Sequence, residues 1–344
     1  MFRIDYFGIF MEHDYSLLVE NLKGRRYDEA LREPVLSDAF HHSGYSDCLK
    51  YTLESMVEID PSYAYKVYAN SRRIHEIISK TLKKKGYNID YRYQGALKTY
   101  SNILLYGDVE IIIIKKSVSD KPHVDMQSLA ADLLDVLSRD QSFKSVDYSD
   151  KTRIRITAQK PTCEIDILPS MWIDSAEYVK TKNEIYRGIA EFDFKHKKVK
   201  KYLPFLNIAR INARDQHTKG NLKCMARLLK SLRADSEDQI NLRDSEINSI
   251  LYSMAEVDLS IDQKNILSLL PKVSSKLGRI TKDTTHFNSL LSPSEKDRVF
   301  GGRPEKQQEV KKLHDSLKQL ISDLKADLEK QNKTIDSDLE YFES

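Results

Sequence analysis

One short segment, residues 108–114, constrains the fold of this 344-residue chain more than any other. Its aliphatic residues, Val109 and the isoleucines at 111–114, predict a short apolar strand. Side chains alternate between the two faces of a strand, so Asp108 and Glu110 point to the same side. The pattern therefore predicts a sheet in which two carboxylates lie next to each other on one face.

Two neighbouring carboxylates repel each other, and a strand this apolar does not need them for its core. A divalent cation that bridges them would remove the repulsion, and Mg²⁺ prefers hard oxygen ligands of this kind. Residues 163–168 repeat the pattern, and we expect Asp166 to end this second acid-bearing strand. Three acids on two strands, with a turn that starts at Gly95, predict a two-metal site for phosphoryl transfer. The alternative is a pair of ordinary half-solvated strands, in which charged and aliphatic residues also alternate.

Three segments carry a resemblance to a known superfamily, and they span residues 94–99, 107–112 and 164–169. A glycine and a small residue, then Asp-x-Glu, then a later Asp on a neighbouring strand resemble the polymerase-β-type nucleotidyltransferases. Within this superfamily the chain is most similar to the cGAS/DncV-like nucleotidyltransferases, the cyclic-oligonucleotide synthases of bacterial anti-phage systems. A long helix expected over 62–85, the Pro169 that ends Ile-Asp-Ile-Leu-Pro, and a helix over 220–233 similar to the family's Arg-x-x-Lys helix support this placement.

The resemblance implies an α+β fold. A polymerase-β-like nucleotidyltransferase lobe with a mixed β-sheet would be joined to a helical C-terminal lobe, with the active site in the cleft between them. Asp108 and Glu110 would hold two Mg²⁺ ions, or Mn²⁺ in their place. Asp166 would complete the shell of the catalytic metal and help to deprotonate the attacking 3′-hydroxyl.

The same resemblance implies a set of nucleotide-binding residues: Gln94, Gly95, Ala96, Thr99, Arg227 and Lys230. Gly95 has no Cβ, so the backbone N–H groups of Gly95 and Ala96 could approach the β- and γ-phosphates and form an anion nest. Ala96 departs from the family's serine, and the lost hydrogen bond to a charged group is worth about 1.5–3 kcal/mol. Thr99 and Ser101 are candidates to supply the missing hydroxyl.

Three cations on the helix expected over 220–235 are spaced by four and three residues: Lys223, Arg227 and Lys230. They form one stripe along the helix, while its leucines form another. Two interpretations stay open at this point. The stripe is either an ordinary solvated face or a surface that meets the triphosphate opposite the acids.

The pattern along the chain predicts three domains: an N-terminal helical extension over 1–60, a catalytic lobe with its leading long helix over 61–200, and a helical C-terminal lobe over 201–344. Within the catalytic lobe, residues 126–137 predict a helix, and a strand over 153–158 is expected to pair with 163–168.

Two patterns in the C-terminal lobe predict helices. Ser-Pro-Ser-Glu at 292–295 has the form of a capping box with proline at the first helical position. The leucine stripe over 304–330 predicts a final helix that packs back onto its own domain rather than forming a free coiled coil. The basic run at 195–201 is either a solvated loop or a contact to nucleic-acid phosphates.

Composition excludes several classes of protein. A net charge of +3 does not indicate obligate nucleic-acid binding, and no apolar run approaches the ~20 residues of a membrane span. The first 15 residues do not have the pattern of a signal peptide. The three cysteines, at 48, 163 and 224, form no Cys-x-x-Cys pair, which favours a reducing cytoplasm and argues against a zinc site. We therefore expect a cytoplasmic protein with no membrane partner.

The function that the resemblance implies is Mg²⁺-dependent joining of nucleoside triphosphates into a cyclic di- or oligonucleotide second messenger for anti-phage defence. Its partners would be the nucleotides, a downstream effector of the product, and a nucleic acid or regulatory protein as activator. One alternative is a transferase that acts on tRNA or protein, which would need a long basic surface. The other is an inactive nucleotide-binding scaffold, which Ala96 favours and the intact acids oppose.

Overall fold

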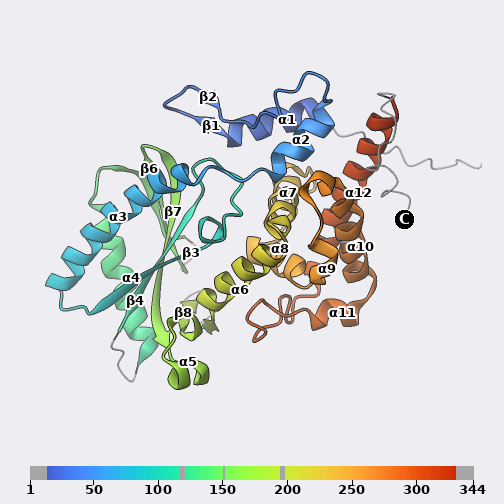
Figure 1. Cartoon of the computed structure of the whole chain (residues 1–344). Coiled ribbons are helices and arrows are strands. Elements are labelled where there is room, and N and C mark those ends of the chain that lie inside the picture. Colours follow the sequence, from blue (N-terminus) through green and yellow to red (C-terminus); the bar gives the residue numbers. More distant parts are fainter. Residues whose placement is uncertain (1–13, 117–120, 150–151, 194–197, 331–344) are drawn as a thin grey trace, which may run out of the picture.

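The computed structural model describes residues 14–116, 121–149, 152–193 and 198–330 (Figure 1). Its main sheet has the strand order β3-β4-β7-β6-β5, and β8 extends it from β7 to β9. The strands are β3 (Ile89–Gln94), β4 (Val109–Lys115), β5 (Phe143–Asp147), β6 (Ile154–Gln159), β7 (Thr162–Ile173), β8 (Gly188–Asp193) and β9 (Lys198–Tyr202). The central pair, β4 and β7, is parallel, and the other pairs are antiparallel. The sheet is therefore mixed, as predicted.

Two helices, α3 (Pro61–Lys84) and α4 (Pro122–Ser138), pack on one face of this sheet (Figure 1). The α3 helix begins where the Asp60 side chain accepts a hydrogen bond from the Ser62 amide, with proline at the first helical position. Val109, Ile111 and Ile113 point to these helices and are almost fully buried. Since side chains alternate along β4, the opposite face is the one that carries Glu110.

The rest of the chain is mainly helical. Its helices are α6 (Pro204–His217), α7 (Asn221–Asp235), α8 (Asp244–Tyr252), α9 (Glu256–Leu259), α10 (Leu269–Lys282), α11 (Thr284–Ser289) and α12 (Glu305–Lys330). They share one apolar core with α1 (Tyr15–Arg25) and α2 (Asp47–Met56) from the N-terminal part of the chain. The leucine stripe of α12 is buried in this core, which confirms that the last helix packs onto its own domain.

Smaller elements complete the fold. The pair β1 (Tyr27–Asp28) and β2 (Glu33–Pro34) follows α1, and α5 (Ala176–Thr181) follows β7. Figure 1 shows α6 between the sheet and the remaining helices, so this helix leads from the sheet into the helical part of the chain. Among the described helices, none is both long enough and apolar enough to cross a membrane.

Two local predictions are wrong. Residues 292–295 do not start a helix: Leu291 and Arg298 form an isolated β-bridge, and the turn between them is closed by the Glu295 amide donating to the Ser292 carbonyl. Proline and serine favour tight turns as well as helix starts, and here the turn prevails. Asp166 also does not end its strand, because β7 continues to Ile173 and pairs there with β8.

Candidate active site

Strand register brings the predicted acids together. Glu110 on β4 lies directly opposite Asp166 on the parallel neighbour β7, and Gln94 on β3 lies opposite Glu110. Neighbouring strands are about 4.8 Å apart, so these three side chains form one row on the same face of the sheet. Asp108 immediately precedes β4 and, two residues before Glu110, is expected on this face.

The pKa values of two of these acids, Asp108 and Glu110, are raised by their surroundings. The Asp108 side chain is accessible to solvent, but the surrounding protein restricts its hydration, and the charges of Glu164, Asp166 and Asp244 repel it. Desolvation first and this repulsion second raise the pKa of Asp108 to about 7. Burial also raises the pKa of Glu110, with the charges of Asp166 and Asp244 adding to the shift. Asp244 comes from α8, so the acid row lies close enough to the helical lobe to interact with it.

Glu110 is held in place from two sides. The side-chain amide of Gln94 donates a hydrogen bond of 2.8 Å to the Glu110 Oε2. Gly95 has a φ of +89°, and a Cβ at this position would lie 2.9 Å from the Glu110 Oε1. Glycine is thus required both for its backbone conformation and for the close approach of the carboxylate.

Asp166 is paired with two arginines, Arg155 on the neighbouring strand β6 and Arg153 immediately before that strand. Arg155 Nε donates to Oδ1 at 2.9 Å, Arg153 Nη1 donates to Oδ2 at 2.8 Å, and Arg155 Nη2 reaches Oδ2 at 3.4 Å. The Arg155 Nε also lies 3.4 Å from a carboxylate oxygen of Glu164. Both oxygens of the third acid therefore accept hydrogen bonds from guanidinium groups.

The donor set fits a divalent cation in its chemistry. The three carboxylates offer hard oxygens, and a cation would relieve the repulsion that raises the pKa of Asp108. Within the described residues, however, no group of three His, Cys, Asp or Glu side chains is arranged to hold a metal ion. In this structure Asp166 is paired with Arg153 and Arg155 instead.

In the loop that follows Gly95, the hydroxyl groups form hydrogen bonds within the loop itself. Thr99 Oγ1 donates to the Ala96 carbonyl at 3.1 Å, and the Thr99 and Ser101 hydroxyls lie 2.8 Å apart. Thr99 and Ser101 are both buried. Neither hydroxyl is therefore a ready replacement for the serine side chain that Ala96 lacks.

The cationic stripe of α7 is buried, which makes its interpretation as a solvated face wrong. Lys230 is 1% exposed and donates to the Ser101 carbonyl at 2.9 Å and to the Ser101 hydroxyl at 2.8 Å. Arg227 donates to the Tyr100 carbonyl at 2.8 Å and to the Met56 carbonyl at 2.7 Å. The two cations thereby connect the helical lobe to the loop after Gly95.

Arg153 and Arg155 were not predicted as site residues from the sequence, although the sequence contains a signal for both. Residues 153–158 were expected as a strand paired with 163–168, and this pairing is confirmed. Continuing the alternation would have put Arg153 and Arg155 on one face of that strand. The antiparallel register then sets Arg155 directly opposite Asp166. Asp244 had no such signal, because its position depends on how the helical lobe packs.

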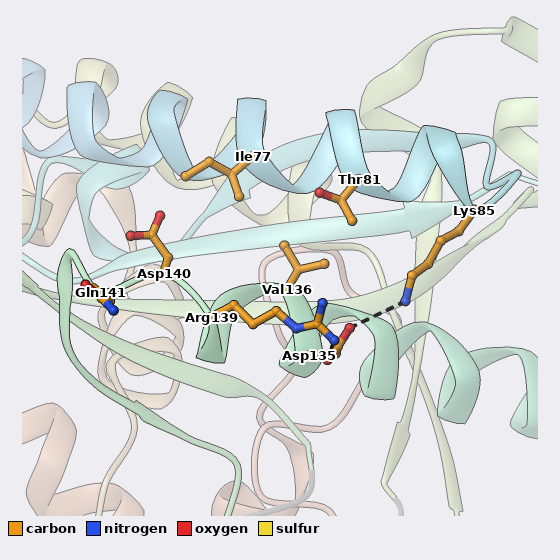
Figure 2. Close-up of a pocket in the computed structure, with 8 residues that line it drawn as sticks. All are labelled: Ile77, Thr81, Lys85, Asp135, Val136, Arg139, Asp140 and Gln141. Carbon is orange, nitrogen blue, oxygen red and sulfur yellow. Dashed lines mark hydrogen bonds and ion pairs between the residues drawn. The ribbon is translucent and has the colours of Figure 1, made fainter.

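A separate cavity of about 580 Å³ lies between α3 and α4, away from the acid row (Figure 2). It is lined by Ile77, Thr81, Lys85, Asp135, Val136, Arg139, Asp140 and Gln141. Figure 2 shows Lys85 directed towards Asp135, and their charged groups are 3.7 Å apart. None of the predicted site residues lines this cavity, so it does not bear on the chemistry of the acids.

Comparison with known proteins gives the same family as the sequence motifs. Residues 209–325 match the family model described as the cGAS/DncV-like nucleotidyltransferase C-terminal helical domain. A c-di-GMP synthase from Capnocytophaga granulosa is 28% identical and aligns over 91% of this chain and 98% of its own length. The cyclic dinucleotide synthase CdnE of Yersinia aleksiciae is 25% identical over 89% of this chain and 86% of its own.

The solved structures agree with the expected α+β architecture. The structure of the STING-associated CdnE c-di-GMP synthase from Capnocytophaga granulosa has a TM-score of 0.74 and 26% sequence identity. The match covers 91% of this chain and 99% of that one. The motifs, the family model over residues 209–325, the relatives and the fold agree, and the chain is similar over most of its length to the cGAS/DncV-like nucleotidyltransferases.

Proposed function

We propose that this nucleotidyltransferase joins nucleoside triphosphates into a cyclic dinucleotide, with GTP as substrate and cyclic di-GMP as product. The observation that carries the proposal is the direct pairing of Glu110 with Asp166 across β4 and β7, with Asp108 beside them. The choice of GTP is supported by relatives described as c-di-GMP synthases, which align over most of their length.

The proposed reaction is an in-line substitution. The 3′- or 2′-hydroxyl oxygen of one nucleotide bonds to the α-phosphorus of another, and the bond from that phosphorus to pyrophosphate breaks. A second reaction of the same kind closes the ring. Divalent metal held by Asp108, Glu110 and Asp166 would supply positive charge for the attacking and leaving oxygens. We propose Mg²⁺, with Mn²⁺ as a substitute.

The protein's own groups have distinct proposed roles. Asp108 must lose its proton before it serves as an anionic ligand, and Asp166 accepts the proton of the attacking hydroxyl. The backbone N–H groups of Gly95 and Ala96 bind the phosphates of the donor nucleotide. Gln94 acts through Glu110, whose carboxylate it holds at 2.8 Å.

Thr99, Arg227 and Lys230 contribute to nucleotide binding through the loop they hold. Lys230 donates two hydrogen bonds to Ser101, and Arg227 donates one to the carbonyl of Tyr100. Thr99 closes the loop internally through the Ala96 carbonyl. We therefore propose that these side chains position the phosphate-binding backbone rather than contact the phosphates.

The proposed product is a second messenger in defence against phage, and it would act through a receptor that binds it. This proposal is supported by the Capnocytophaga granulosa relative, which is described as STING-associated.

A cyclic dinucleotide lacks a terminal phosphate, and this property distinguishes it from every linear intermediate.

The test is incubation of purified protein with each radiolabelled nucleoside triphosphate, singly and in mixture, with Mg²⁺ or Mn²⁺. Products are treated with phosphatase and separated. A resistant product from GTP alone supports the proposal, and its absence from Asp166→Asn ties it to this site. Label transferred to added tRNA or protein would favour the macromolecular alternative, and no transfer at all would favour an inactive scaffold.

A further inference from the structure

Asp166 is the acid of the row that is paired with arginines. Its two oxygens accept three hydrogen bonds from Arg153 and Arg155, and its side chain is 10% exposed. The arginines themselves reach solvent, with side chains 36% and 47% exposed. A buried acceptor with accessible donors is an arrangement in which the donors can leave while the acid stays.

Charge explains why the arginines take this position without metal. Asp108, Glu110, Glu164 and Asp166 bring several negative charges to one region of the sheet, and Arg153 and Arg155 lower this repulsion. A divalent cation carries the same total charge as two guanidinium groups. Cation and arginines therefore compete for one carboxylate, and each makes the other unnecessary.

We propose that Arg153 and Arg155 are an exchangeable counter-charge, which neutralises Asp166 in the metal-free enzyme and moves to substrate phosphate when a divalent cation takes the acid. The phosphate half of this statement rests on the proposed nucleotidyl transfer. The metal half rests only on the contacts of Asp166.

Phosphate is the chemically suitable second partner. A guanidinium group presents parallel N–H donors that match the oxygens of a phosphate as well as those of a carboxylate. Arg155 lies on β6, the strand next to the acid-bearing β7, and Arg153 immediately precedes β6. Once released they remain beside the acids, where the triphosphate of a bound nucleotide brings its own negative charge.

The metal half is tested by calorimetric titration of MgCl₂ or MnCl₂ into nucleotide-free protein. We expect Arg153→Gln and Arg155→Gln to bind the cation more tightly than wild type, with the double variant gaining ~10-fold or more, the scale of effects seen when groups around metal ligands change. Arg139→Gln is the matched control, because it removes the same charge from a side chain that is 77% exposed, at the residue that follows α4. An unchanged dissociation constant in the double variant overturns the proposal.

The phosphate half is tested by titrating a non-hydrolysable GTP analogue into metal-saturated protein. The double variant should bind the analogue ~10-fold or more weakly, although it binds metal better, and Arg139→Gln should match wild type. Unchanged analogue binding would remove the arginines from the nucleotide site. The double variant Arg153→Lys with Arg155→Lys keeps the positive charges but lacks the parallel N–H donors of the guanidinium groups. Its affinity for the analogue should lie between those of wild type and the glutamine variants.

Neither titration depends on turnover, so this inference and the proposed function fail separately. A wild-type enzyme that makes cyclic product, with unchanged metal binding in the double variant, would reject the exchange and retain the function. Tighter metal binding in that variant, with no nucleotidyl transfer by wild type, would retain the exchange and reject the function. The variants lose the ion pairs of the buried Asp166, so their melting temperatures should fall, and a circular dichroism spectrum equal to that of wild type would show that they fold.

Discussion

Lys230 in the helical lobe donates hydrogen bonds to both the carbonyl and the hydroxyl oxygen of Ser101, at the end of the loop that follows Gly95. Its ammonium group also lies 3.0 Å from the Asp244 carboxylate. One buried cation therefore connects the loop that we propose for phosphate binding, the α7 helix and an acid whose charge acts on Asp108 and Glu110. The two lobes meet at this residue.

Removing this amine should destabilise the protein. Lys230→Ala removes the donor to the Ser101 carbonyl, and a buried polar group left unsatisfied costs about 1–3 kcal/mol. Urea denaturation of the variant should show this loss in the free energy of unfolding. Lys264→Ala removes an exposed lysine and should stay within about 0.5 kcal/mol of wild type. Equal stability of the two variants would show that the contacts of Lys230 contribute nothing.

Asp108 should make stability depend on pH in an unusual direction. Its folded-state pKa of about 7 lies above the ordinary value of 3.8, so the folded protein binds a proton more readily than the unfolded chain between these values. Stability contributed by this group is present at low pH and is lost as the pH rises towards 7. Asp108→Asn should therefore raise the metal-free melting temperature at pH 8 and leave it nearly unchanged at pH 4.

Scanning calorimetry across this pH range checks the prediction. Asp38→Asn, in an exposed turn, is the control for a general change in charge. If Asp108→Asn and Asp38→Asn follow the same curve, the carboxyl of Asp108 is not destabilised by its surroundings. Metal affinity of the wild type should increase with pH through the same range, because the anionic carboxylate is the ligand.

Glycine 95 allows a test in which backbone strain and side-chain displacement are separated. Gly95→Ala and Gly86→Ala both place a Cβ at positive φ, +89° and +82°, which costs about 1–2 kcal/mol. Only the Cβ at residue 95 meets another group, the Glu110 carboxylate at 2.9 Å; nothing lies within 4 Å of the one at residue 86. We expect both variants to lose stability, and only Gly95→Ala to lose nucleotidyl transfer. Comparable activity in the two would show that Glu110 tolerates the displacement.

Substitutions of the three acids should have similar effects on nucleotidyl transfer but different effects on the melting temperature. Glu110→Gln and Asp166→Asn should each reduce transfer by at least ~100-fold, since even groups behind metal ligands contribute 10–100-fold. Asp166→Asn should not raise the metal-free melting temperature as Asp108→Asn does, because it deprives Arg153 and Arg155 of their partner. Near-normal turnover in either variant would exclude that residue as a ligand.

The sequence predicted the elements that repeat a simple pattern. The apolar spacing of α3, the alternation of β4 and the leucine stripe of α12 all correspond to buried faces in the structure. These predictions succeed because burial of a periodic apolar face is a local property of the segment. Pairing of β6 with β7 followed from the same alternation and the short connection between the strands.

What the sequence could not predict depends on contacts between distant segments. The spacing of Lys223, Arg227 and Lys230 placed them on one stripe, yet it contained no information on what that stripe meets. Lys230 is buried because the carbonyl of Ser101, far away in the sequence, accepts its hydrogen bond. Burial of a charged side chain requires such a partner, and the partner is fixed only by tertiary packing.

Ala96 provides the last test, because the structure removes its two candidate substitutes. The hydroxyls of Thr99 and Ser101 are hydrogen-bonded to each other, and Lys230 donates to Ser101. A serine at position 96 would add a hydroxyl beside the backbone N–H groups that we propose for phosphate binding. Ala96→Ser should therefore tighten binding of a GTP analogue or speed transfer by up to the ~1.5–3 kcal/mol of one hydrogen bond to a charged group.

Ala96→Thr is a useful companion to this variant, because it carries the same hydroxyl together with an extra methyl group. A gain in Ala96→Ser that is reduced in Ala96→Thr would indicate a hydroxyl acting in a confined site. Calorimetry with the analogue and initial rates with GTP separate binding from chemistry. If neither quantity improves in Ala96→Ser, the backbone of this loop already binds the phosphates without help from a side chain, and the alanine is no defect.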